Sequence, residues 1–153
     1  MKKILLTTAL IACCLTTLFA QPCLPAGITF TTQEEIDNFQ INYPNCNEIE
    51  GDVWIQGGDI WNLAGLSVLT STGGELSIIE NYSLASLEGL DNLTSIGSDL
   101  QILNNVSLAS LVGMENLNSI SGNLQIGHYT FPIPVGHPSL TSLTGLNNLT
   151  SIG

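Results

Sequence analysis

The chain has 153 residues, of which 13 are Asp or Glu and only two, Lys2 and Lys3, are Lys or Arg, so its formal net charge is −11. This imbalance leaves no basic surface and therefore argues against binding to nucleic acid or to anionic lipid headgroups. The length fits a single domain, and no linker or low-complexity segment divides the sequence.

Residues 1–20 have the pattern of a secretory signal peptide: two lysines, an apolar run over 4–19, and Ala20 just before polar sequence. An alternative is a lipoprotein signal, because residues 10–13 (Leu-Ile-Ala-Cys) resemble a bacterial lipobox, in which Cys13 would be lipidated. Cleavage after Ala20 is favoured because it leaves two cysteines that can pair. We therefore expect a secreted or cell-surface protein with no transmembrane span in the mature chain, whose formal charge would be −13.

Residues 21–50 are predicted to form an N-terminal cap that contains Cys23 and Cys46. An exported chain meets oxidising conditions, so these two cysteines are predicted to form a disulfide. The closed loop would stabilise the fold by roughly 3 kcal/mol on the chain-entropy model. A metal pair or a reactive thiol is the alternative, but the sequence has no Cys-x-x-Cys motif and no nearby histidine to support either.

The same segment predicts a short strand at 28–30 and one amphipathic helix after it. Thr32 is followed three residues later by Glu35, which is the capping-box pattern, so the helix should begin near residue 33. Ile36, Phe39 and Tyr43 would share its apolar face, and the proline that follows would end it. We expect this helix to cover the open end of the first repeat.

Residues 51–153 repeat a block of about 24 residues, a length within the range of periods that solenoid repeats have. Each block contains a Leu-x-Ile triplet, a Leu-x-Gly-Leu turn and a Leu-x-Ser-Ile closing segment, with small substitutions. A fixed period of this length predicts a mainly β solenoid of about four stacked repeats that share one core. Solenoids more often bind other molecules than catalyse reactions.

Within each triplet the alternation predicts a strand with its first and third side chains inward and its middle side chain outward. Strands of successive repeats should pair in parallel. Glycine recurs at a tight corner, and asparagine recurs where it can hydrogen-bond the turn of a neighbouring repeat. The predicted outward residues are Trp54, Ser77, Gln101 and Gln125.

Two segments resemble the receptor L domain, the ligand-binding module of growth-factor-receptor ectodomains. They are Cys46-x-x-Ile-x-Gly-x-Val-x-Ile55 and Asn92-Leu-Thr-Ser-Ile-Gly97. The resemblance implies a short right-handed β-helix, related to leucine-rich repeats, with an N-terminal helix and disulfide and a role in extracellular recognition. Similar repeats occur in exported bacterial surface proteins, which this chain resembles more closely, so growth-factor binding is not carried over. The end at Gly153 falls on a repeat boundary, and we expect further sequence beyond it.

One repeat carries an insertion. Ile102 and Gly113 are 11 residues apart, whereas Ile126 and Gly145 are 19 apart, so eight extra residues lie within 128–138. Insertions in repeat proteins become loops, often on the binding face. The alternative is a tolerated loop that folds over an apolar patch. Candidate ligand-binding residues in this segment, which also contains three prolines, are His128, Tyr129, Phe131 and His137.

The outward strand face is the second candidate site. It would combine Trp54, Gln101 and Gln125 with the polar residues beside them in sequence, and Trp61 and Tyr82 would extend a patch. Amide and carboxylate groups around a tryptophan suit a glycan, although a solvated strand face is the alternative.

Other chemistry is sparse. His128 and His137 lack a third ligand at obvious spacing, so no metal or other cofactor is expected. No Gly-x-Ser-x-Gly elbow is present and no pair of carboxylates stands out, so we expect no enzyme. Four Asn-x-Ser/Thr sequons fall at repeat positions 81, 92, 105 and 148. Two functional hypotheses remain: a non-catalytic extracellular recognition or adhesion module that binds a protein or glycan, or a structural spacer of a larger surface protein.

Overall fold

The structure is a computed structural model that describes residues 22–127 and 139–153. The predicted signal peptide, Cys13 and the insertion with its four candidate residues, His128, Tyr129, Phe131 and His137, lie outside the described residues. The described part is mainly β, with two parallel sheets and three short helices, α1, α2 and the 3-10 helix η1.

The first sheet has five strands, which are the predicted triplets and the predicted strand before the helix. Its parallel order, β10-β8-β6-β4-β2, follows the chain in reverse. Equivalent residues pair across the sheet: Val53 pairs with Leu76, and Leu76 pairs with Leu100. The strands are β2 (Ile28–Phe30), β4 (Val53–Ile55), β6 (Leu76–Ile79), β8 (Leu100–Leu103) and β10 (Leu124–Gly127).

The second sheet has six shorter strands, also parallel, in the order β1-β3-β5-β7-β9-β11. From β5 onward these strands lie in the closing segments of the repeats, which the sequence analysis did not assign to strands. The strands are β1 (Pro22–Cys23), β3 (Glu48–Ile49), β5 (Ser71–Thr72), β7 (Ser95–Ile96), β9 (Ser119–Ile120) and β11 (Ser151–Ile152).

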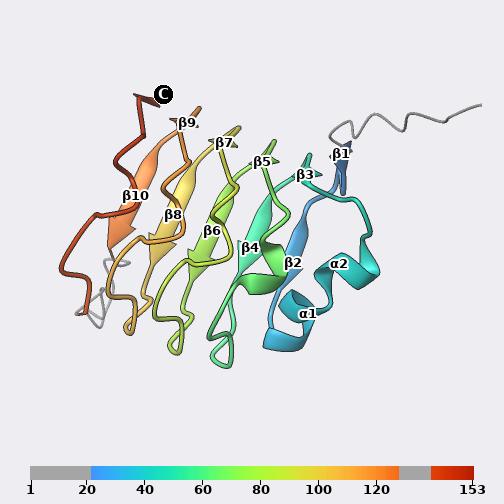
Figure 1. Cartoon of the computed structure of the whole chain (residues 1–153), viewed down its shortest axis with the longest axis horizontal. Coiled ribbons are helices and arrows are strands. Elements are labelled where there is room, and N and C mark those ends of the chain that lie inside the picture. The colour runs from blue at the N-terminus through green and yellow to red at the C-terminus, as the bar shows by residue number, and fades with distance from the viewer. Residues whose placement is uncertain (1–21, 128–138) are drawn as a thin grey trace, which may run out of the picture.

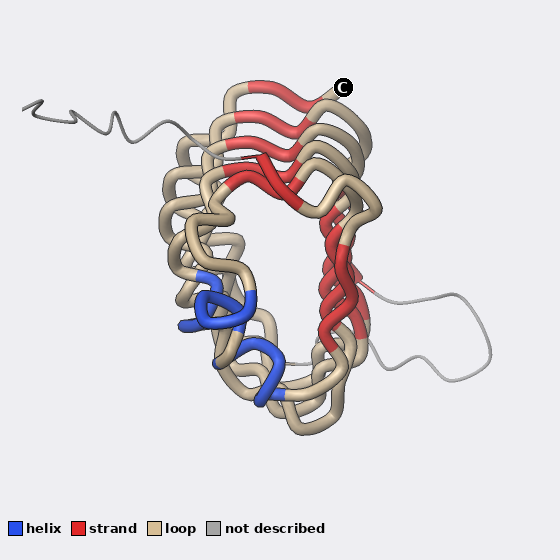
Figure 2. Tube along the Cα trace, turned by 90° about the vertical axis from the view of Figure 1, so that its right-hand side faces the viewer, coloured by secondary structure: helices blue, strands red, loops and turns tan. Residues whose placement is uncertain are grey.

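Each repeat therefore contributes one strand to each sheet, and successive repeats lie side by side along the long axis of the molecule (Figure 1). Viewed along that axis, the five-stranded sheet forms one side, and the helices and connecting segments lie across from it (Figure 2). Leucine and isoleucine side chains from both sheets and the connections pack into one buried cluster. Burial of this shared cluster is the main force that holds the repeats together.

The predicted alternation is confirmed in β4, β6 and β8, where the first and third residues of each triplet are buried. Leu124 and Ile126 are only half-buried, because β10 is an edge strand. One outward residue is nevertheless buried: Ser77 has 0% exposure. It lies in register between Trp54 and Gln101, whose larger side chains flank it, and its hydroxyl donates to the Glu75 carboxylate.

The predicted capping box is confirmed, but the helix is split in two. Thr32 caps α1 (Gln33–Asp37) and accepts a hydrogen bond from the Glu35 N–H, while the Glu35 carboxylate accepts one from the Thr32 N–H. Asn38 interrupts the helix with φ −89° and ψ 1°, and α2 (Phe39–Asn42) follows. Asparagine is a weak helix former, so the interruption costs little.

The helices pack at the N-terminal end of the repeats through an aromatic pair. Ile36 and Phe39 are fully buried, and the Phe39 ring meets Phe30 of β2 edge to face at 5.7 Å between centroids. Tyr43, which was predicted to share this apolar face, follows α2 and is 38% exposed. Its ring still lies 5.6 Å from that of Phe39.

The recurring asparagines link neighbouring repeats, as predicted. Asn81 and Asn105 are fully buried; Asn81 donates to the Ile55 carbonyl at 2.9 Å, and Asn105 donates to the Ile78 carbonyl at 2.8 Å. A second, exposed row makes the same kind of bond, in which Asn92 donates to the Ser67 carbonyl at 2.8 Å. The predicted corner glycines are Gly65, Gly89, Gly113 and Gly145. The last three have positive φ, and a Cβ on any of them would clash with the backbone of the preceding repeat.

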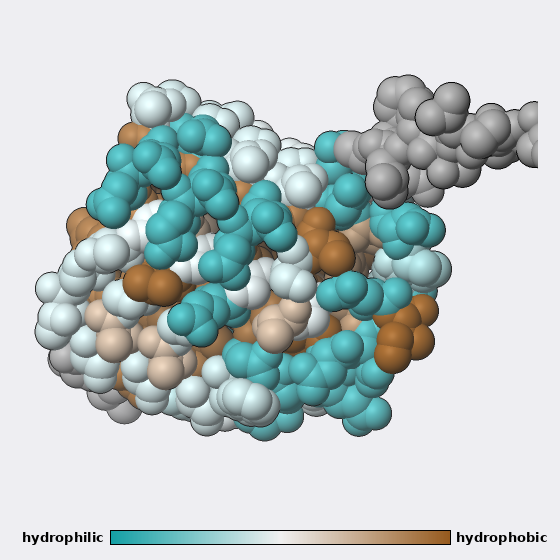
Figure 3. All heavy atoms as spheres, viewed as in Figure 1, coloured by the Kyte–Doolittle hydropathy of each residue, from teal (hydrophilic) through white to brown (hydrophobic). Residues whose placement is uncertain are grey.

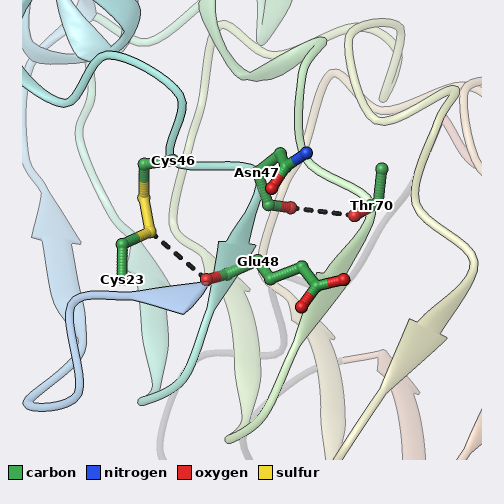
Figure 4. The surroundings of a disulfide bond; sticks show 5 residues. All are labelled: Cys23, Cys46, Asn47, Glu48 and Thr70. Atoms are coloured by element: carbon green, nitrogen blue, oxygen red, sulfur yellow. Dashed lines mark hydrogen bonds between the residues drawn. A yellow bond between two sulfur atoms is a disulfide. The ribbon is translucent and has the colours of Figure 1, made fainter. Parts of the chain in front are cut away.

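The predicted disulfide between Cys23 and Cys46 is present, with 5.6 Å between the Cα atoms (Figure 4). It joins β1, at the edge of the six-stranded sheet, to the segment just before β3. The Cys23 sulfur lies 3.2 Å from the Glu48 carbonyl oxygen, and since a disulfide sulfur has no proton this is a polar contact. Nearby, Thr70 donates its hydroxyl to the Asn47 carbonyl at 3.0 Å and so ties the segment to the next repeat.

Candidate functional site

The outer face of the five-stranded sheet brings Trp54, Gln101 and Gln125 together in one row. The registers place Thr29 opposite Trp54, then Ser77, Gln101 and Gln125 on successive strands. Trp54 is 38% exposed, Gln101 is half-buried, and Thr29 and Gln125 are exposed. Successive strands of a sheet are about 4.8 Å apart, so this row presents a hydroxyl and an aromatic ring on neighbouring strands, then, beyond the buried Ser77, two amides on neighbouring strands.

Most polar residues beside this row have structural partners. Asp52 accepts a hydrogen bond from the Glu75 N–H at 2.8 Å, and Asp99 accepts one from the Asn123 N–H at 2.7 Å. At the other end of the strands, Gln56 donates to a carboxylate oxygen of the next repeat at 2.9 Å. These side chains join repeats, so a ligand on this face would meet mainly the Trp54 ring and the two glutamines.

A groove of about 690 Å³ lies elsewhere, between the helices and the connecting segments. Trp61, which is 62% exposed, lines it together with Asp37 at the end of α1. The other lining residues come from the region of η1 (Ala64–Leu66) and from the turn at 86–91, which supplies Glu88 and Asp91. Hydrophilic side chains cover much of this side of the molecule, with apolar ones scattered among them (Figure 3).

One buried glutamine organises this groove. Gln33 is only 9% exposed, and its carboxamide oxygen accepts hydrogen bonds from the Trp61 N–H at 2.9 Å and the Asn62 N–H at 3.2 Å. Its amide nitrogen donates to Asp37 at 2.9 Å. The Asn62 side chain in turn accepts a hydrogen bond at 2.9 Å from the N–H of Ala64, the first residue of η1. The Gln33 side chain therefore holds both the backbone of Trp61 and the carboxylate of Asp37.

A second hollow of about 530 Å³ adjoins the first, because Ser67 lines both. Tyr43, Val68 and Asn92 also line it.

Neither a metal centre nor a membrane-spanning helix is found in the part of the chain that the structure describes. Residues 22–127 and 139–153 contain no group of three or more His, Cys, Asp or Glu side chains that could hold a metal ion. None of the helices described is long and apolar enough to cross a bilayer.

The structure thus groups the predicted residues Trp54, Gln101 and Gln125, and separates Trp61 from them. Tyr82 is 49% exposed and lies in a connecting segment, not in the strand row.

The groove itself was not predicted, because Asp37 and Glu88, which line it together, are far apart in sequence. One feature of the sequence could nonetheless have indicated the groove. The positions equivalent to Trp61 in the next two repeats are Ala85 and Ala109, so a tryptophan there departs from the repeat.

Comparison of the chain with protein-family models, with curated proteins and with solved structures found no match.

Proposed function

We propose that this protein is a non-catalytic extracellular recognition or adhesion module that binds a protein or a glycan through the outer face of the five-stranded sheet. The observation that supports this is the aligned row of Trp54, Gln101 and Gln125. An exposed tryptophan buries much area at low entropy cost, and flanking amides can donate and accept hydrogen bonds to hydroxyl or peptide groups.

We also propose that the two parallel sheets form a short right-handed β-helix. Two parallel sheets in register at the sequence period support a short right-handed β-helix, the architecture implied by the resemblance to receptor L domains. The Cys23–Cys46 disulfide is consistent with an extracellular protein. Export would proceed through residues 1–20, with lipidation of Cys13 as the alternative.

Binding is favoured over catalysis because the carboxylates along the sheet are used to connect repeats. Asp52 and Asp99 each accept a backbone hydrogen bond from the following repeat. A glycosidase needs two carboxyl groups that face the same glycosidic bond, whereas the carboxylates of Asp52 and Asp99 accept hydrogen bonds from the protein backbone.

The test is binding of the secreted protein to an array of glycans and extracellular proteins, with Trp54→Ala and Tyr82→Ala variants beside the unmodified chain. Both variants remove an exposed aromatic ring, but only the first alters the strand row, so Tyr82→Ala is the matched control. We expect Trp54→Ala to weaken binding by at least about tenfold, or 1.4 kcal/mol, while Tyr82→Ala leaves it unchanged.

If no ligand is found, or if Trp54→Ala binds as well as the unmodified chain, the strand-face proposal fails. Absence of any ligand would favour the second hypothesis, a structural spacer whose repeats add length and present other domains.

A further inference from the structure

We propose that the groove around Trp61 binds a lysine or arginine side chain presented by an extended segment of another protein. The groove is formed by α1, η1 and the turn at 86–91, and none of its lining residues belongs to the five-stranded sheet. The inference is therefore independent of the proposed strand-face site.

The chemistry of the groove suits a cation. Trp61 is 62% exposed and lines the groove together with Asp37, Glu88 and Asp91. A cation over the face of an indole is attracted by the ring quadrupole, and tryptophan is the strongest of the aromatic residues in this respect. The negatively charged carboxylates also attract a cation, and a guanidinium can bind a carboxylate through two parallel hydrogen bonds.

The residues that the structure describes cannot supply this cation, because none of them is a lysine or an arginine. Asp37 and Asp91 each have one oxygen engaged, by Gln33 at 2.9 Å and by the Gly89 N–H at 2.7 Å. The second oxygen of each accepts no hydrogen bond from the residues that the structure describes, so it can meet a ligand. The Glu88 carboxylate accepts no hydrogen bond from any residue that the structure describes.

The groove is also held in place before any ligand arrives. Gln33 fixes the backbone of Trp61 and the carboxylate of Asp37 through the two ends of one buried amide. Preorganisation of this kind lowers the entropy cost of binding.

Two of these residues are not explained by the repeat. Alanine occupies the position equivalent to Trp61 in the next two repeats. The positions equivalent to Glu88 in the repeats on either side are Ala64 and Val112. The repeat architecture therefore accommodates small apolar residues at both positions. Trp61 and Glu88, which stand where other repeats have small apolar residues, thus place an aromatic ring and a carboxylate beside the same groove.

The adjoining hollow indicates that the occupant is a chain segment. It shares Ser67 with the Trp61 groove and is lined by Tyr43 and Val68, which can contact residues next to the bound cation. An isolated amine would leave this second hollow unused.

The inference can be tested with a capped tetra-arginine peptide and the same peptide made with citrulline, which has nearly the same shape but no charge. Binding would be followed by titration calorimetry and by the NMR signal of the Trp61 indole N–H. We expect the arginine peptide to shift that signal and to bind at least about tenfold more tightly than the citrulline peptide, with an affinity that falls as salt is added.

Variants distinguish this site from general attraction to an acidic protein. Trp61→Ala and Glu88→Gln should each weaken binding of the arginine peptide by at least about threefold. Glu50→Gln, which removes the same charge from an exposed position outside the groove, and Tyr82→Ala, which removes an exposed aromatic ring outside it, should leave binding unchanged. Unfolding curves of all four variants would confirm that each is folded.

Three results would overturn the inference: equal binding of the two peptides, equal effects of Glu88→Gln and Glu50→Gln, or unchanged binding by a folded Trp61→Ala variant. Trp61-dependent binding of a neutral oligosaccharide, with no binding of the arginine peptide, would also overturn it and assign the groove to a glycan.

Discussion

Replacement of Asn105 by alanine should test how the repeats are held together. The side chain is fully buried, and its oxygen accepts hydrogen bonds from the Asn81 N–H at 2.9 Å and from the Asn81 amide nitrogen at 3.1 Å. Its nitrogen donates to the Ile78 carbonyl at 2.8 Å. Asn105→Ala removes all three bonds from the interface between two repeats.

The expected loss follows from the partners left behind. The Asn81 N–H would lose its partner inside the protein, which costs about 1–3 kcal/mol. The Ile78 carbonyl lies in the ladder between β6 and β8 and would lose one bond, worth about 1 kcal/mol. The Asn81 amide nitrogen keeps its bond to the Ile55 carbonyl at 2.9 Å, so it adds less. We therefore expect Asn105→Ala to lower the free energy of unfolding by about 3 kcal/mol, a large share of the 5–15 kcal/mol typical of a domain.

Urea unfolding followed by circular dichroism measures this loss. With an m-value of about 1.5 kcal/mol per molar urea, the midpoint should fall by about 2 M. Asn92→Ala is the matched control, because Asn92 is exposed and donates one bond, to the Ser67 carbonyl at 2.8 Å. It should cost about 1 kcal/mol or less. Equal losses in the two variants would refute the argument that the buried row stabilises the stack more than the exposed row does.

Three further predictions concern stability. Gly113→Ala should cost more than about 1 kcal/mol in the same urea assay, because Gly113 has φ +108° and its Cβ would meet the Leu87 backbone. Gly58→Ala should change stability by no more than about 0.5 kcal/mol, because its Cβ would make only an ordinary contact with the Tyr82 ring at 4.0 Å. Reduction of the Cys23–Cys46 disulfide should cost about 3 kcal/mol, and a midpoint unchanged by reductant would contradict this. Hydrogen bonds from the Thr31 backbone and hydroxyl and from Thr32 hold the pKa of Glu35 below its ordinary value of 4.5. This stabilisation is present above pH 4.5 and is lost as the pH falls through the lowered folded-state pKa, so Glu35→Gln should destabilise the protein at neutral pH but not in strong acid.

The repeat made the five-stranded sheet predictable. A regular period fixes both the alternation within each triplet and the register between triplets, so the burial of Val53, Leu76 and Leu100 could be predicted from the sequence. The capping box at Thr32 and Glu35 was equally direct, because it depends on two residues three positions apart.

Features that depend on neighbours in space were not predicted. The six-stranded sheet consists of two-residue strands, which are too short to show an alternation. Ser77 is outward in its strand but is covered by the larger residues of adjacent strands, which the pattern of one strand cannot reveal. The Trp61 groove joins α1 to a turn two repeats later in the chain, so only the departures from the repeat at Trp61 and Glu88 pointed to it.

The four sequons give a prediction that separates the two asparagine rows. Asn81 and Asn105 are fully buried and donate to carbonyls inside the protein, so a glycan on either nitrogen has no space in the folded chain. Asn92 and Asn148 are exposed, and each donates to a carbonyl of the preceding repeat at 2.8 Å and 2.6 Å. A glycosylated amide keeps one N–H, so these bonds can persist while the sugar extends into solvent.

Expression through a eukaryotic secretory pathway, followed by mass spectrometry of the folded product, would therefore find glycans on Asn92 and Asn148 only. Thr94→Ala, which removes the sequon of Asn92 and keeps the asparagine, should leave Asn148 as the single modified site. A glycan on Asn81 or Asn105 in folded protein would mean that the buried row can open without unfolding the stack. That result would contradict the loss of about 3 kcal/mol in unfolding free energy that we expect for Asn105→Ala. If the buried row could open to admit a sugar, its hydrogen bonds would not contribute that much to the stability of the fold.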